Sequence, residues 1–272
     1  MLGRAALAVL ESTGRLGERT EAALSPGLTG FVLARHRFMD DALLAALQAG
    51  AEQVILLGAG YDTRVWRLHE ALRDIPVFEV DHPATGARKA ALAAAGSDPL
   101  PTAHPIRVAM DFRTDRLDQR LLAAGARRGA RTFVVWEGVS MYLTRAAVHD
   151  TLVLLRDLGG PGSEVVMDWW SLVDGPDVLS TVHRMAPLML HLLGEPLTLG
   201  IHPEEVPGFC ARAGWRAAEV VDAAELERRY AKESRRVLPE MYVTRLERGP
   251  SVRGPRAPGD AERAAVSPLR QR

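Results

Sequence analysis

The fold is decided by one stretch of the sequence, QVILLGAGYDTR, which occupies residues 53–64. Its mostly apolar run over 53–57 is short and continuous, which is typical of a buried parallel strand. The Gly58-Ala59-Gly60 turn follows directly, and glycines here let the chain reverse tightly and let a ligand approach the backbone. A segment of helical length over 64–73 and a second apolar run over 76–81 come next. Together they predict a strand–helix–strand unit with a right-handed crossover.

The same alternation continues along the chain. The periodicity indicates N-terminal helices broken at Pro26-Gly27, and later helices over 84–95, 115–124 and 145–158. Further strands are expected over 106–110, 132–136, 164–168, 215–221 and 242–247. Strands that alternate with helices predict an α/β fold with a doubly wound, mostly parallel, seven-stranded sheet of the Rossmann-like kind.

We expect one domain over residues 1–248, followed by a disordered tail over 249–272 that is rich in Pro, Gly, Ala and Arg. The segment over 171–213 is inserted after the carboxyl end of a predicted strand, where an inserted segment can cover a binding site. The domain is expected to comprise an N-terminal helical cap over 1–49, a cofactor-binding core over 50–170, a helical lid over 171–213 and C-terminal strands over 214–248.

The composition excludes several classes of function. The 272 residues carry 34 basic and 34 acidic side chains, so the net charge is zero and the broad positive field of a nucleic-acid or anionic-membrane binder is missing. Cys210 is the one cysteine, which excludes an internal disulfide and favours a reducing, cytoplasmic location. No apolar run approaches a membrane span, and the eight histidines show no compact metal-ligand spacing.

Acidic residues follow three successive predicted strands. Asp81 ends the second strand, 21 residues after Gly60, where a carboxylate can accept hydrogen bonds from both hydroxyls of a ribose. Asp111 ends the third strand and can accept from an adenine amino group, while Phe112 covers the ring. Glu137 ends the fourth strand. These positions predict an adenosine-containing ligand at the sheet edge.

The loop after the first strand argues against a dinucleotide. The dinucleotide fingerprint requires a third small residue at position 63, where this chain has Thr63. Asp62 stands beside it, and a carboxylate there would repel a pyrophosphate. A nicotinamide-dependent oxidoreductase is therefore the less favoured alternative.

Five segments together resemble the leucine carboxyl methyltransferase-like family of S-adenosylmethionine-dependent methyltransferases. They are ARHRFMDD at 34–41, LLGAGYDTR at 56–64, FEVDHP at 78–83, DFR at 111–113 and WEGVSMYL at 136–143. The resemblance covers about residues 30 to 170 and implies the class I methyltransferase fold. It also implies that Arg35 pairs with the methionine carboxylate of the cofactor, that Asp81 holds the ribose, and that Glu137 lies beside the methionine portion. The expected cofactor-binding residues are Arg35, Gly58, Ala59, Gly60, Asp62, Asp81, His82, Asp111, Phe112, Glu137 and Gly138.

The sequence leaves two kinds of methyl acceptor open, a carboxylate and a hydroxyl. The resemblance implies a carboxylate of a small molecule or peptide, which is already ionised near neutral pH and needs only to be oriented. A hydroxyl acceptor of secondary metabolism would need a base to remove its proton. A protein that binds S-adenosylmethionine without catalysing a reaction is a further alternative. The candidate catalytic residues are Tyr142, His183 and Arg37, with Arg184 and Arg245 as further arginines that could orient a carboxylate.

Overall fold

The structure is a computed structural model, and it describes residues 27–95, 105–112, 114–171, 198–230 and 236–249. Its centre is a seven-stranded sheet with the order β3-β2-β1-β4-β5-β7-β6, in which β7 runs antiparallel to both of its neighbours. The predicted doubly wound, mostly parallel sheet is confirmed. The strands are β1 (Gln53–Leu57), β2 (Val77–Asp81), β3 (Ile106–Ala109), β4 (Thr132–Trp136), β5 (Glu164–Trp170), β6 (Trp215–Val221) and β7 (Met241–Arg248).

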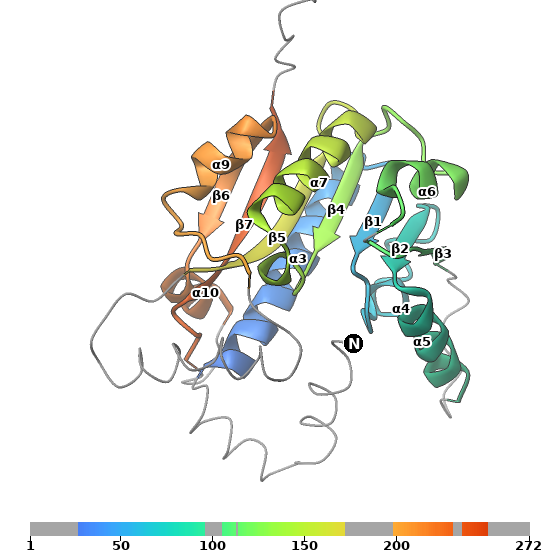
Figure 1. Cartoon of the computed structure of the whole chain (residues 1–272). Coiled ribbons are helices and arrows are strands. Elements are labelled where there is room, and N and C mark those ends of the chain that lie inside the picture. Colours follow the sequence, from blue (N-terminus) through green and yellow to red (C-terminus); the bar gives the residue numbers. More distant parts are fainter. Residues whose placement is uncertain (1–26, 96–104, 113, 172–197, 231–235, 250–272) are drawn as a thin grey trace, which may run out of the picture.

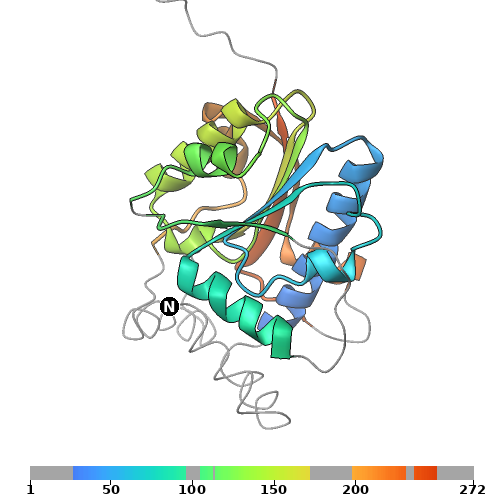
Figure 2. The same ribbon diagram turned by 90° about the vertical axis from the view of Figure 1, so that its right-hand side faces the viewer.

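Helices cover both faces of this sheet. In Figure 1, α6, α7 and α9 lie in front of the strands, while α3 crosses behind them, and the turned view of Figure 2 separates these layers. The bounds are α3 (Leu28–Gln48), α4 (Arg64–Arg67), α5 (Pro83–Ala95), α6 (Leu117–Ala123), the 3-10 turn η1 (Ser140–Tyr142), α7 (Arg145–Leu158), α9 (Val206–Arg212) and α10 (Ala223–Tyr230).

The expected helix over 64–73 is wrong in length. α4 ends at Arg67, and Leu68 leaves the helical region with φ −111° and ψ 25°. The carbonyl oxygen of Trp66 lies 3.0 Å from Nδ1 of His69, so a side chain occupies the acceptor that the next helical turn would use. The chain continues in turns until β2 begins.

Alternation along the central strands fills two cores. Ile55 and Leu57 point to the face that is covered by α6 and α7, whereas Val54 and Leu56 point to the face that is covered by α3. All five positions of β1 and of β4 are buried. Each large apolar side chain that is fully buried in this way contributes about 1.5–3 kcal/mol, so the sheet is a rigid base for the residues at its edge.

The apolar face of α3 sets the position of two polar side chains. Phe31, Phe38 and Leu43 are buried in the second of these cores. Phe31 and Phe38 have the helical spacing of seven residues, and Arg35 and His36 lie between them on the same helix. The packing therefore carries both residues to the carboxyl edge of the sheet.

The register of the parallel strands brings four segments to one level. Leu57 pairs with Val80 and with Trp136, and Trp136 in turn pairs with Met167. The residue that follows each of these positions therefore lies on the same edge of the sheet, although the four are far apart in sequence. They are Gly58, Asp81, Glu137 and Asp168.

The chain leaves this edge after β5 and returns to it. The backbone N–H of Ile201 donates to the carbonyl of Trp170 at 2.9 Å, and that of Thr198 donates to Met141 at 2.8 Å. Most of the expected lid, together with the first part of the N-terminal cap and nearly all of the expected tail, lies outside the described residues. In the part of the chain that the structure describes, no helix combines the length and apolar character needed to span a bilayer.

Candidate functional site

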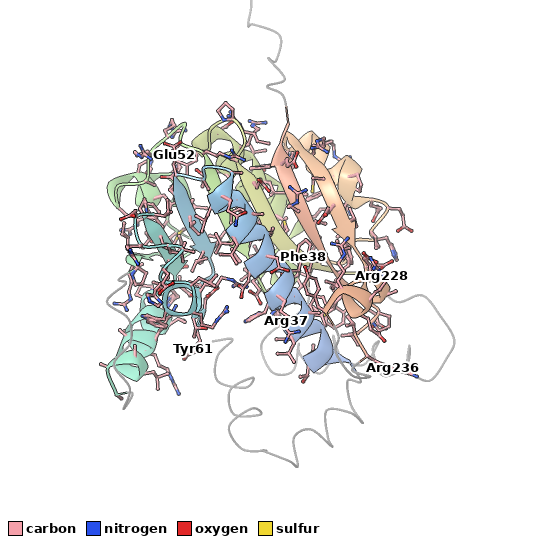
Figure 3. The ribbon with its side chains drawn as sticks, turned by 180° about the vertical axis from the view of Figure 1, so that it is seen from behind. Arg37, Phe38, Glu52, Tyr61, Arg228 and Arg236 are labelled. Atoms are coloured by element: carbon pink, nitrogen blue, oxygen red, sulfur yellow. The ribbon has the colours of Figure 1, made fainter. Side chains whose placement is uncertain are left out.

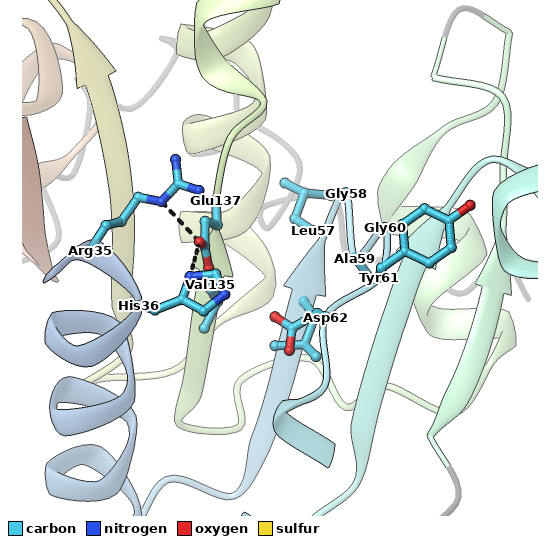
Figure 4. A pocket seen from close by; sticks show the side chains of 11 residues that line it. Arg35, His36, Leu57, Gly58, Ala59, Gly60, Tyr61, Asp62, Val135 and Glu137 are labelled. Carbon is cyan, nitrogen blue, oxygen red and sulfur yellow. Dashed lines mark hydrogen bonds and ion pairs between the residues drawn. The ribbon is translucent and has the colours of Figure 1, made fainter. Parts of the chain in front are cut away.

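A cavity of about 280 Å³ opens at the shared edge of β1 and β4. Figure 4 shows Arg35 and His36 of α3 with Glu137 on one side, and the turn from Gly58 to Asp62 on the other. The lining residues are Arg35, His36, Leu56, Leu57, Gly58, Ala59, Gly60, Tyr61, Asp62, Val135 and Glu137. The structure thus brings together at this cavity three of the five segments of the expected site, those at 34–41, 56–64 and 136–143.

Arg35 is held by carboxylates from two neighbouring strands. Its Nε donates to Oε1 of Glu137 at 2.9 Å, and its Nη1 donates to Oδ2 of Asp168 at 2.6 Å. The guanidinium also lies 5.3 Å from the centre of the Phe31 ring, within the range of a cation–π contact. These contacts fix α3 to the ends of β4 and β5 and orient the guanidinium beside the cavity.

A second arginine, Arg64, lies beneath the first and is 1% exposed. Its Nε donates to Oδ1 of Asp40 at 2.7 Å, and its Nη1 donates both to Oε2 of Glu137 at 2.8 Å and to Oδ2 of Asp62. The backbone N–H of Arg64 also donates to Oδ1 of Asp62 at 2.7 Å. One buried side chain therefore joins α3, the loop after β1 and the end of β4.

The surrounding charges decide the ionisation of these groups. Burial alone would raise the pKa of Glu137, but Arg35, His36 and Arg64 outweigh burial and hold that pKa far below its ordinary value of 4.5. Burial would lower the pKa of Arg64, yet its three carboxylate partners raise it. Complete burial raises the pKa of Asp168, although Arg35 and the Gly138 N–H both oppose that rise.

The turn after β1 requires glycine and is held by Asp81. Gly58 has a φ of +70°, and a Cβ at this position would lie 2.5 Å from Cγ2 of Val139. Oδ2 of Asp81 accepts the backbone N–H of Gly60, and its Oδ1 accepts that of His82 at 2.6 Å. Asp81 therefore sets the shape of the glycine turn, while each oxygen retains acceptor capacity for a ligand.

A second, smaller cavity of about 130 Å³ adjoins the first at Ala59 and Gly60. It is lined by Asp81, His82 and residues of α5 and β3. A buried ion pair forms part of its wall, because Nζ of Lys89 donates to Oε1 of Glu79 at 2.6 Å and each side chain is 4% exposed. Burial nevertheless raises the pKa of Glu79 above its ordinary value of 4.5.

Asp111 and Phe112 line neither cavity, although they follow in sequence the β3 residues that line the second one. Asp111 was expected at the end of a strand, and the structure places it two residues beyond β3, where its backbone N–H donates to Oδ2 of Asp115 at 2.9 Å. The Phe112 ring is 45% exposed, which is unusual for so large an apolar side chain. An aromatic face exposed in this way is suited to contact with a flat ligand ring.

The candidate catalytic residues do not meet at the cavity. Tyr142 packs against the core behind β1, and Arg37 donates from Nη1 to the carbonyl of Tyr230 at 3.1 Å, on the outer side of α3 (Figure 3). Arg245 lies on β7 and pairs with Glu164 and Glu247. None of these three lines either cavity. His183 and Arg184 lie outside the described residues.

Three residues that the sequence analysis passed over belong to the site: His36, Arg64 and Asp168. Nδ1 of His36 lies 2.5 Å from Oε1 of Glu137, which is an ion-pair contact without hydrogen-bond geometry. Asp168 could have been found from the sequence, because it is a carboxylate at the same level of the sheet as Asp81 and Glu137, which lie at the ends of the parallel strands β2 and β4. Arg64 had no such signal, since a charged side chain after a turn is usually solvated.

Comparison with known proteins finds methyltransferases by family model and by sequence similarity. A family model described as leucine carboxyl methyltransferase matches residues 4–155. A protein of Mycolicibacterium gilvum, named as an inferred S-adenosyl-L-methionine-dependent methyltransferase, is 35% identical over 187 residues, or 62% of this chain and 74% of the relative. A Parafrankia protein with the same kind of name is 32% identical over 213 residues, and the match covers 77% of this chain but only 64% of that relative.

A solved structure agrees with the fold. The crystal structure of an inferred methyltransferase from Thermobifida fusca has a TM-score of 0.59 to this chain at 19% sequence identity. The match covers 87% of this chain and 90% of that one. At this identity the likeness concerns the arrangement of strands and helices alone.

Proposed function

Because the chain belongs to the leucine carboxyl methyltransferase family and is an S-adenosyl-L-methionine-dependent methyltransferase, we propose that it forms a methyl ester on a carboxylate of a small molecule or peptide. One observation carries the proposal. Every residue that lines the larger cavity, from Arg35 to Glu137, lies within the stretch that matches the leucine carboxyl methyltransferase model.

The charges around the larger cavity fit a cationic methyl donor. Four carboxylates, those of Asp40, Asp62, Glu137 and Asp168, are joined to the two buried arginines Arg35 and Arg64. Arg67 also pairs with Asp40, so the group carries one net negative charge when every carboxylate is ionised and His36 is neutral. A sulfonium cation is attracted to such a site, whereas a pyrophosphate is repelled.

We assign the parts of the cofactor to the two adjoining cavities. Asp81 faces the smaller cavity and would accept from the ribose hydroxyls, and the exposed ring of Phe112 would cover the adenine. Arg35 would bind the methionine carboxylate through Nη2, for which no hydrogen bond is found among the described residues. The glycine turn would lie against the cofactor between these two ends.

The residues of this chain contribute alignment and the exclusion of water. Bound S-adenosyl-L-methionine supplies an electrophilic methyl group, so that an electron pair of the acceptor oxygen forms the new C–O bond while the S–C bond breaks and leaves a neutral thioether. A carboxylate acceptor is ionised already, and no residue has to remove a proton. The rigid edge formed by Gly58, Glu137 and Asp168 keeps donor and acceptor in line, which can contribute several kcal/mol to the rate.

A hydroxyl acceptor is the second candidate, and it is favoured by one observation. His36 lies beside an ionised carboxylate in the cavity wall, and such a pair could remove a proton from a phenol or alcohol. The two candidates differ in their products, since mild alkali releases methanol from a methyl ester but not from a methyl ether.

The test uses methyl-labelled S-adenosylmethionine with matched acceptors, such as benzoate with benzyl alcohol and phenylacetate with phenethyl alcohol. We expect label in acids only, released by alkali as methanol, and lost in the Asp81→Ala variant. Glu52→Gln is a suitable control, because Glu52 lies at the opposite end of the sheet beside Arg127 and Arg131. Alkali-stable label in the alcohols would contradict carboxyl methylation and support the second candidate.

A further inference from the structure

The imidazole of His36 has one side buried against the protein and the other open to the larger cavity. Nδ1 is buried and lies 2.5 Å from Oε1 of Glu137, yet the side chain as a whole is 44% exposed. The exposed part is therefore the edge of the ring that carries Nε2. Because His36 also lines the cavity, this edge faces the space where a ligand would lie.

Most N–H donors of the two arginines at the site are bound to carboxylates; the remaining Nη2 of Arg35 is assigned to the cofactor, and Nη2 of Arg64 is buried. Arg35 is 11% exposed and bound to Glu137 and Asp168, and Arg64 is 1% exposed and bound to Asp40, Asp62 and Glu137. Arg37, the neighbour of His36, is bound to the carbonyl of Tyr230 instead. Among the described cationic or titratable side chains that contact Glu137, His36 is thus the most exposed to the cavity.

We infer that His36 binds the methyl acceptor, with Nε2–H of its imidazolium donating a hydrogen bond to the acceptor carboxylate. The inference rests on the proposed function, since a carboxylate acceptor requires a donor and a hydroxyl acceptor requires a base. Glu137 compensates the imidazolium charge from behind, at Nδ1, and is itself kept ionised by Arg35 and Arg64. A charge-assisted hydrogen bond of this kind is short and directional, so it would orient the reacting oxygen.

The proposal predicts whether binding of the acceptor carboxylate strengthens or weakens as the pH rises. Other charged or titratable groups near the ring are Arg35 and Asp40 on α3, Glu137 after β4, Asp62 and Tyr61 across the cavity, and Arg64 and Asp168 through their bonds to this cluster. Imidazole is the side chain whose ordinary pKa lies between about pH 5 and 8. The binding form is the protonated one, so carboxylate binding weakens as the pH rises through the His36 titration. A base role would give the opposite slope.

His36→Gln retains an N–H donor but removes the charge and the titration. The matched control is His149→Gln, because His149 is a histidine of comparable exposure, 34%, with its Nδ1 3.2 Å from a carboxylate of Asp150, and it lines neither cavity. Both variants are compared with the parent protein, saturated with S-adenosylhomocysteine, and the probe is benzoate at up to 100 mM with benzyl alcohol as its neutral counterpart.

NMR titration of the His36 ring is the first readout. We expect benzoate, and not benzyl alcohol, to shift the titration midpoint upward by at least ~0.5 pH unit, because the bound anion stabilises the imidazolium. Calorimetry is the second readout, and benzoate should bind about tenfold more weakly to His36→Gln while His149→Gln and the affinity for S-adenosylhomocysteine stay within about threefold of the parent.

An unchanged midpoint, or equal benzoate binding by the parent and His36→Gln, would overturn the role of His36. This failure is distinguishable from failure of the proposed function. Methyl-ester formation that is unaffected in His36→Gln would leave carboxyl methylation standing without His36, whereas methyl-ether formation that rises with pH and is lost in His36→Gln would overturn both.

Discussion

Nη1 of Arg64 lies 2.8 Å from Oε2 of Glu137, and this contact ties the start of α4 to the end of β4. Arg64 is 1% exposed and Glu137 is 11% exposed, so water screens this pair much less than a pair on the surface. The same guanidinium reaches Asp40 on α3, and the site is therefore built around one arginine that touches three separate segments. Two of these segments, the loop after β1 and the end of β4, also line the larger cavity.

Arg64→Met is expected to destabilise the fold by about 3–5 kcal/mol, because it removes the cationic partner of Asp62 and one of the cationic partners of Asp40 and of Glu137 at a buried position. Arg64→Lys keeps the charge but cannot span three partners, so its loss should be smaller. Urea unfolding of the two variants measures the difference. Arg67→Met provides the control, since Arg67 also pairs with Asp40 but is 43% exposed. Equal stability of parent and Arg64→Met would show that the network is not needed.

Asp81→Ala should weaken binding of S-adenosylmethionine by about 2–3 kcal/mol, because a charged acceptor is lost from the ribose and the Gly60 N–H loses its partner. Asp111→Ala should cost less, since Asp111 lies two residues beyond its strand and outside the lining of both cavities. Calorimetric titration gives both affinities, and circular dichroism checks the fold. If Asp81→Ala binds as the parent does, the assignment of the ribose to this strand end is wrong.

The stability of the protein should respond to acid through Glu137. Its folded pKa lies below the ordinary value of 4.5, so ionised Glu137 stabilises the fold above about pH 4.5, and this stabilisation is lost as the pH falls toward the folded pKa. Glu137→Gln should be less stable than the parent at pH 7, and the difference should narrow below pH 4. Denaturant unfolding between pH 3 and 7 tests this, and a gap that widens in acid would contradict it.

Lys89→Met should make the stability of the protein depend on the ionisation of the buried carboxyl group of Glu79. Burial already raises the pKa of Glu79, and removal of Lys89 removes the charge that opposes burial. A folded pKa above the unfolded one favours the protonated form, so the variant should lose stability as the pH rises above about 4.5. The double variant Lys89→Met/Glu79→Gln should recover most of the loss of about 3–5 kcal/mol at pH 7. Absence of recovery would mean that Lys89 acts through packing.

Much of the fold follows from short-range patterns. Apolar runs located β1, β2 and β4 to within a residue, and the acidic residues after them marked the functional edge, because parallel strands end together. The helix over 64–73 was overestimated, since nothing in the periodicity shows that the His69 side chain occupies the carbonyl of Trp66. α10 was not predicted, because its eight residues are too short for a clear period.

The site was predicted less completely than the fold. Asp81 and Glu137 could be found from their positions after strands, but the partners of Glu137 depend on how α3 packs against the sheet. Arg64 appears in the sequence as the charged first residue of a predicted helix, and its burial follows only from three-dimensional contacts with Asp40 and Glu137. His36 likewise can be assigned to the site only from the three-dimensional cavity that it lines.

We assign the two adjoining cavities to one molecule of S-adenosylmethionine. Calorimetric titration of the full chain with S-adenosylmethionine and, separately, with NADH tests this assignment most directly. We predict micromolar binding of S-adenosylmethionine, about 8 kcal/mol, and no measurable binding of NADH, because the carboxylate cluster around Asp62 and Glu137 attracts a sulfonium and repels a pyrophosphate. Comparable affinity for NADH, or no affinity for S-adenosylmethionine, would contradict the account.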